Sequence, residues 1–138
     1  MTITTIGWSR KSLWRVARDI YIAESAEEAR KDVMGGTLAR DFTEYFFKMV
    51  PKIRGNLDIF KTEKSMSDSE VTIEYMMDNL WIVGSPDDAV EKIRELYDHV
   101  GGFGVLLVMG HEWKPEDKWK RSMRLLAEDV MPRLRDLK

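Results

Sequence analysis

Two apolar runs in the second half of the chain give the clearest pattern of strands alternating with helices. LWIV at residues 80–83 has the composition of a short buried strand, and FGVLLVM at residues 103–109 is continuously apolar. Apolar residues recur at helical spacing along residues 89–100 and again along residues 119–134. The segment 71–138 is therefore predicted to contain β-α-β-α units whose strands are parallel.

The first half predicts one strand followed by a long helix. WRVARDIYIA, at residues 14–23, is rich in β-branched residues, as strands are. Ser25 followed three residues later by Glu28 is the pattern of a capping box, and helical spacing continues to about residue 49. Gly35-Gly36 is expected to kink or break this helix.

A long connection is expected to separate the two halves. Residues 50–70 contain Pro51, Gly55 and a polar tail, with one short helical turn predicted at 57–60, and residues 71–80 are a short helix candidate. We therefore expect a single domain over residues 1–138. It would begin with an irregular segment, 1–13, followed by a strand, helix and insertion-like connection, 14–70.

The number of strands predicts an incomplete architecture. The pattern supports two or three parallel strands with four or five helices, whereas a closed (β/α)8 barrel has eight strands in about 250 residues. So few parallel strands cannot cover both of their faces. We therefore expect the chain to cover them by forming a homodimer or by binding a missing barrel half.

Composition excludes several classes of function. The 22 basic and 24 acidic residues are balanced, so nothing favours nucleic acid or a membrane surface as a partner. There is no cysteine and there are only two histidines, which makes a metal site improbable. No run approaches the length of a membrane helix or a secretion signal, so a cytoplasmic location is expected. The five Trp and nine Met are numerous enough to suggest a surface that meets a partner.

Four segments, taken in order, resemble a known family. WRVARDIYIAESAEEAR (14–30), GGTLARDFTEYFF (35–47) and the two βα units in 80–134 are similar to the carboxyl end of luciferase-like, flavin-dependent monooxygenases of the limonene- and alkanal-monooxygenase type. The resemblance implies an α/β fold that is the C-terminal part of a TIM-like barrel. Residues 80–93 would be its seventh unit and residues 103–134 its eighth. It also implies FMN as cofactor and a separate flavin reductase as partner.

Five residues are candidates for the site. His111 follows the last strand, where α/β barrels carry their active sites, and is the candidate hydrogen-bond donor or general base. A plain loop histidine is the alternative. Gly84 and Ser85 precede a helix N-terminus that could hold the phosphate of FMN, although Ser85 would also serve as a simple helix cap. Gly110 and Trp113 flank His111 and are the remaining candidates for cofactor contact.

Two classes of function stay open. The first is a shortened luciferase-like monooxygenase, which in the family uses FMNH2 and oxygen to oxygenate a small organic substrate and which would be inactive as this chain alone. The alternative is a non-catalytic, self-associating α/β module, or a flavin-binding protein without turnover. The sequence does not identify a substrate.

Overall fold

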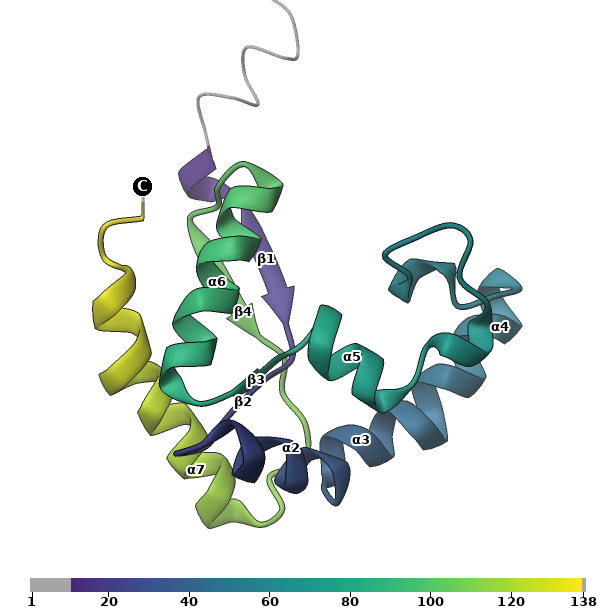
Figure 1. Cartoon of the computed structure of the whole chain (residues 1–138), viewed down its shortest axis with the longest axis horizontal. Coiled ribbons are helices and arrows are strands. Elements are labelled where there is room, and N and C mark those ends of the chain that lie inside the picture. The colour runs from purple at the N-terminus through teal and green to yellow at the C-terminus, as the bar shows by residue number, and fades with distance from the viewer. Residues whose placement is uncertain (1–10, 138) are drawn as a thin grey trace, which may run out of the picture.

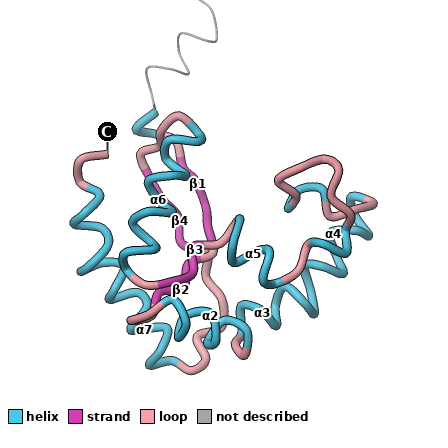
Figure 2. Tube along the Cα trace, in the orientation of Figure 1, coloured by secondary structure: helices cyan, strands magenta, loops and turns pink. Residues whose placement is uncertain are grey.

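The computed structural model describes residues 11–137, which form short parallel strands with helices packed against them (Figure 1). Figure 2 shows helices on both sides of the lower strands and on one side of the upper strands. The α-helices and strands, in chain order, are β1 (Arg15–Arg18), β2 (Ile20–Ile22), α2 (Ala26–Met34), α3 (Thr37–Asp41), α4 (Phe47–Arg54), α5 (Ile73–Asn79), β3 (Ile82–Gly84), α6 (Pro86–Val100), β4 (Val105–Val108) and α7 (Glu116–Leu125).

The predicted first strand is divided at Asp19, because its two halves have different partners. Its first half, β1, pairs in parallel with β4, and its second half, β2, pairs in parallel with β3. The described part of the chain thus has four short strands where two or three were expected. The strands of units 80–93 and 103–134 are not paired with each other, although consecutive strands of a barrel are neighbours. The numbering of these units as seventh and eighth therefore does not match the observed pairing.

Side chains of β2 and β3 are buried on both faces. One face carries Tyr21 and Val83, which pack in a cluster with residues of α2, α3 and α5. Ile20, Ile22 and Ile82 point to the opposite face and pack against α6 and the C-terminal helical segment. This double burial explains why these strands consist almost entirely of apolar residues.

The pair β1–β4 is covered on one face only. Leu106 and Val108 pack against the cluster formed with α6 and α7, whereas the alternate residues of the same strand face outward. The exposed face, which we call the open sheet face, consists of Arg15, Ala17, Val105, Leu107 and Met109. Parallel sheets are ordinarily buried on both faces, so this surface is unusual for a complete domain.

The long helix predicted from residue 25 to about 49 is longer and more divided than expected. It breaks at Gly35-Gly36, as predicted, and resumes as α3, a π-helical turn at Phe42–Phe46, and α4. The end at about residue 49 was wrong, because the helix passes through Pro51 and ends at Gly55, whose φ of 84° suits glycine. These divisions give six α-helices within residues 11–137 rather than four or five.

Residues 1–10 of the predicted irregular segment lie outside the described residues. The helical turn predicted at 57–60 is observed as the 3-10 turn Asp58–Phe60, and a second 3-10 turn, Asp68–Glu70, was not predicted. Thr72 caps α5, and Ser85 caps α6, which ends at Gly101. The α/β class with small parallel sheets is thus observed. Across residues 11–137 no helix is long and apolar enough to cross a membrane.

Candidate functional site

His111 lies just beyond β4 and joins two carboxylates from distant parts of the chain. Its Nε2 is 2.5 Å from Oδ1 of Asp19, the residue between β1 and β2. Its Nδ1 is 3.0 Å from Oδ2 of Asp41, the last residue of α3. The cluster Asp19–His111–Asp41 therefore ties together the end of β1, the long helix and the loop after β4.

The geometry favours the doubly protonated form of His111. An ionised carboxylate only accepts hydrogen bonds, so both ring nitrogens must carry a proton to satisfy both partners. The hydrogen bond to Asp19 raises the pKa of His111 above its ordinary value, against the opposing effect of burial. Burial raises the pKa of Asp41, but hydrogen bonds from His111 and Arg40 outweigh it and leave that pKa lowered.

The cluster borders a largely apolar pocket of about 600 Å³. The residues that line it come from the ends of β1 and β4, the π-helical turn, α4 and the 3-10 turn that follows. Its polar lining consists of Asp19, Asp41 and His111, beside Gly110. The apolar lining consists of Phe42, Tyr45, Phe46, Val50, Ile59, Phe60 and Met109. A pocket with one polar corner and aromatic walls suits an apolar small molecule or a planar ring.

A network of ion pairs with alternating charges holds the loop after β4 in place. Arg40 binds both Asp41 and Glu112, and Lys114 binds the other carboxylate oxygen of Glu112. The hydroxyl of Thr37 donates to the carbonyl of Glu112 at 2.7 Å. The position of His111 is therefore determined by contacts on both sides of it in the sequence.

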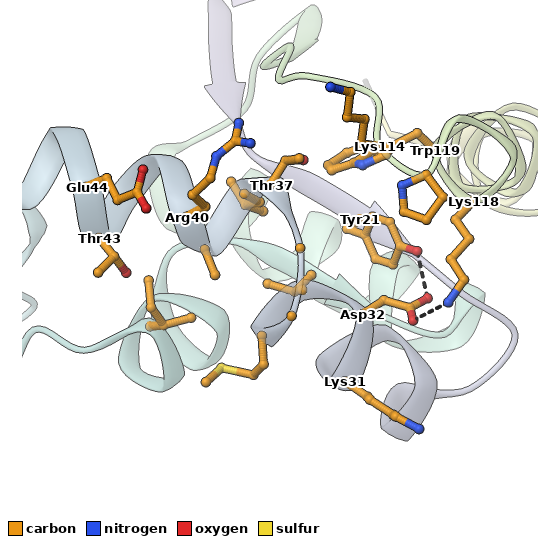
Figure 3. A pocket seen from close by; sticks show the side chains of 18 residues that line it. Tyr21, Lys31, Asp32, Thr37, Arg40, Thr43, Glu44, Lys114, Lys118 and Trp119 are labelled. Carbon is orange, nitrogen blue, oxygen red and sulfur yellow. Dashed lines mark hydrogen bonds and ion pairs between the residues drawn. The ribbon is translucent and has the colours of Figure 1, made fainter.

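A second pocket, of about 880 Å³, is lined in part by residues of α2, α3 and α7 (Figure 3). In it the hydroxyl of Tyr21 donates to Asp32 at 2.7 Å, and Lys118 pairs with the same carboxylate. Burial and the contact with Asp32 raise the pKa of Tyr21 far above its ordinary value. This arrangement links β2, α2 and α7, and its polar groups are engaged with one another, so we interpret it as structural.

Gly84 and Ser85 lie apart from the His111 pocket. Asp88 accepts hydrogen bonds from both the amide and the hydroxyl of Ser85, which completes a capping box. A Cβ on Gly84 would lie 2.6 Å from the Cβ of Asp88, so the helix packs directly against the strand end. The amide and the hydroxyl of Ser85 are thus both engaged with Asp88. Neither residue lines any of the three pockets described for residues 11–137.

The two other candidates flank His111, as the sequence requires, but their surroundings differ. Gly110 lines the pocket, and a Cβ built on it would meet no atom within 4 Å. Trp113 is largely exposed and lines none of the three pockets. The structure therefore brings Gly110 together with His111 and leaves Trp113 outside.

Asp19 and Asp41 were not among the predicted site residues. Asp19 interrupts the alternation of a strand, which was the one sequence signal that marked it. Asp41 lies within a helix of mixed charge and carries no such signal. Although a histidine lies between two acids here, no group of three metal-ligating side chains within residues 11–137 is placed to hold a metal ion.

The fold and the pocket together indicate which general class of protein this structure resembles. A polar cluster at the carboxyl ends of parallel strands, beside an apolar pocket, is the arrangement of an α/β protein that acts on or binds small molecules. No family model matches the chain. Individual relatives do match it, and they narrow this class.

The relatives are monooxygenases. The chain is 28% identical to 3,6-diketocamphane 1,6-monooxygenase of Pseudomonas putida, over 90% of the chain and 33% of the relative. It is 30% identical to limonene 1,2-monooxygenase of Rhodococcus erythropolis, over 86% of the chain and 28% of the relative. A solved structure, the oxygenating constituent of 3,6-diketocamphane monooxygenase from P. putida in complex with FMN, superposes with a TM-score of 0.80. That match covers 88% of the chain and 34% of the other chain, at 28% identity.

These matches confirm the resemblance found in the sequence. The chain is similar to luciferase-like monooxygenases over most of its own length, and it spans about a third of the length of the curated relatives it matches. The solved relative binds FMN, the cofactor that the resemblance implied.

Proposed function

We propose that the chain is the C-terminal part of a luciferase-like, FMN-dependent monooxygenase and forms one wall of its active site. The observation that carries this proposal is the Asp19–His111–Asp41 cluster at the carboxyl ends of the strands, beside an aromatic pocket. In β/α barrels this end of the strands carries the active site. The similarity to a FMN-bound monooxygenase over 88% of the chain supports the same assignment.

The pocket fits the ring of FMN better than its phosphate. Phe42, Phe46 and Phe60 offer apolar surface for a planar ring, and Gly110 leaves open space beside it. Asp19 and Asp41 would repel a phosphate placed in the same corner. We therefore expect the phosphate to be held by residues outside this chain.

The residues of this chain would bind and orient the flavin ring and would exclude water from the reacting atoms. When bound and reduced, FMN supplies the electrons with which oxygen is activated for transfer to a small organic substrate. The aromatic wall would keep water away from the reacting atoms, and His111 would hold the carboxylate of Asp19 at the pocket's edge. The reductant is expected from a separate flavin reductase.

We further propose that oxygenation requires the rest of a barrel. The open sheet face is the surface that strands of a complete barrel would cover, since residues of such strands alternate between the interior and the helical exterior. Alone, the chain would bind flavin weakly and would not turn over substrate.

The same face supports the second candidate function, a self-associating module without catalysis. Exposed apolar residues on a parallel sheet can be covered by a second copy as well as by other barrel strands. A homodimer that binds flavin without turnover belongs to this alternative.

A chimera tests the first proposal. In 3,6-diketocamphane 1,6-monooxygenase, the third that this chain matches would be replaced by residues 11–137, and FMN binding and ketone oxygenation would be measured. We expect FMN binding and measurable turnover. We also expect His111→Phe in the chimera to reduce kcat at least tenfold, because the carboxylate of Asp19 would lose its partner.

The control for the chimera is His99→Gln, which changes an exposed histidine of α6 and should leave turnover unchanged. A folded chimera that neither binds FMN nor oxygenates would contradict the proposal. The isolated chain provides a further control, since FMN should then bind at least a hundredfold more weakly than to the chimera.

A further inference from the structure

The side chain that is available to a ligand in the pocket is Asp19 rather than His111. Both ring nitrogens of His111 are hydrogen-bonded to carboxylates. Both oxygens of Asp41 are engaged, Oδ2 by His111 and Oδ1 by Arg40. Asp19 uses Oδ1 for His111, and its Oδ2 has no hydrogen-bond partner among residues 11–137.

Asp19 lines the pocket, and its Oδ2 is not one of the fully buried unpaired atoms of residues 11–137, so it is accessible to a ligand. The side chain of Asp19 is only 15% exposed, and the rest of the pocket is lined mostly by aromatic and aliphatic residues. A charged acceptor in such a place is stabilised by any hydrogen-bond donor that reaches it. Its neighbours within the polar corner are already engaged with one another.

We propose that Asp19 is the ligand-contact residue of this pocket, and that the pocket takes an uncharged, largely apolar group, either a ring of a larger molecule or a small molecule, whose hydroxyl or N–H donates to Oδ2. His111 and Asp41 are then positioning residues, which hold the carboxylate in one orientation. The inference rests on the proposed function for its place in a reaction, but it names the chemistry of the site that this chain forms by itself.

Charge, hydrogen bonding and desolvation exclude three other classes of ligand. A carboxylate or phosphate would face the free oxygen of Asp19 and be repelled by it. A ketone has no donor for that oxygen, and its own carbonyl finds neither ring nitrogen of His111 free. An ammonium ion would lose its hydration against the apolar wall. The carboxylates of Asp19 and Asp41 are already balanced by His111 and Arg40.

The test is a matched set of probes on the isolated chain. Binding of 2-decalol, 2-decalone and decalin-2-carboxylate would be measured by isothermal titration calorimetry, because the three share one bicyclic skeleton. We expect the alcohol to bind about tenfold more tightly than the ketone, since a hydrogen bond to a charged acceptor gives a difference of that order. The carboxylate should bind most weakly.

Two variants assign the preference to one residue. Asp19→Asn removes the charge and places an amide in the corner, so the alcohol and the ketone should bind within twofold of each other. Asp129→Asn makes the same chemical change at an exposed residue that lines none of the three pockets, and should keep the preference for the alcohol. Circular dichroism and the urea midpoint would establish that both variants fold.

Equal binding of the three probes to the wild type, or no binding of any, would overturn the proposal without reference to a variant. A preference that survives Asp19→Asn in a folded protein would overturn the assignment to Asp19. These results are independent of the chimera, which can fail to oxygenate while the isolated chain still prefers the alcohol.

Discussion

At the scale of single residues, the imidazole of His111 links three segments of the chain through its contacts with Asp19 and Asp41. Its side chain is 8% exposed and lies between the carboxylates of Asp19 and Asp41. Removing one member of such a buried ionic cluster leaves the others without compensation. The contribution of this cluster to stability should therefore depend on the protonation of the imidazole.

We predict that this dependence appears as a loss of stability with rising pH. The pKa of His111 is raised in the folded state, so the contribution of its proton is fully present below the unfolded value of about 6.5. It is lost as the pH rises through the folded pKa. Urea unfolding between pH 5.5 and 9 should show it, and His111→Gln should lower the unfolding free energy by about 1–3 kcal/mol at low pH.

The variant His111→Gln should also flatten the pH profile in this range, because the group whose proton is bound more tightly in the folded state is gone. The matched variant His99→Gln changes the other histidine, in the exposed part of α6, and should keep the wild-type slope. An unchanged slope in His111→Gln would show that the imidazole is not the group responsible.

Of these residues, His111 and Gly110 were predicted as site candidates from their place after an apolar strand, and their role stays a prediction. The sequence did not identify Asp19 or Asp41, because the contacts that give them a role join residues 70 or more positions apart. Spacing along a chain carries little information about such pairs. Ser85 was correctly predicted as a cap, and its proposed phosphate role remains a prediction that the position of Asp88 disfavours.

At the scale of elements, a side chain of α7 satisfies the backbone of β2 where strand pairing does not. The amide of Ile22 donates to Oγ of Ser122 at 2.8 Å, and Ser122 is almost completely buried. Because β4 pairs only with β1, this part of the strand needs another acceptor. A helix hydroxyl therefore completes the edge of the strand.

We predict that Ser122→Ala lowers the unfolding free energy by about 1–3 kcal/mol, because it leaves the buried amide of Ile22 without an acceptor. Hydrogen exchange measured by NMR should be faster at that amide than in the wild type. Ser69→Ala, in an exposed 3-10 turn, is the control and should change the stability by less than about 0.5 kcal/mol. Wild-type exchange at Ile22 in the variant would mean that the contact contributes nothing.

The helices and strands were largely predictable from the sequence, but the points at which they are divided were not. Caps and glycines located the ends of α5 and α6 because those signals are local. The division of the first strand depends on partners far along the chain. The passage of α4 through Pro51 follows a π-helical turn, which helical spacing does not reveal.

At the scale of the whole molecule, the open sheet face is the face of the β1–β4 pair that no helix of residues 11–137 covers. Its apolar members are Ala17, Val105, Leu107 and Met109, and they form one surface on two neighbouring strands. Contiguous apolar surface of this kind favours association. This holds whether the partner is a second copy or the rest of a barrel.

We predict that the isolated chain self-associates and that Leu107→Glu prevents it. Leu107 is 44% exposed at the centre of the open sheet face, so a charge there would have to be buried on association. Sedimentation velocity should show a shift toward the monomer in this variant. Ile53→Glu replaces a side chain that is 76% exposed on α4, away from that face, and should leave the distribution unchanged. A wild type that is monomeric at all concentrations would contradict the prediction.

Counting strands was enough to predict an uncovered sheet, because two or three parallel strands have too little chain to cover them. Which face is uncovered depends on where α6 and α7 pack, and this could not be derived from the pattern of residues. The confirmed resemblance gave the α/β class, whereas the strand order came from the structure alone.

The pairing of the strands also determines when they can form during synthesis. β1 is made first, yet its partner β4 begins at Val105, and the partner of β2 begins at Ile82. Among the described residues, β1 therefore has no backbone partner until β4 has been synthesised, and β2 has none until β3 has been synthesised. Until then Ile20, Tyr21 and Ile22 lack the strand that they pair with in this structure, and we expect this delayed, long-range pairing to slow folding.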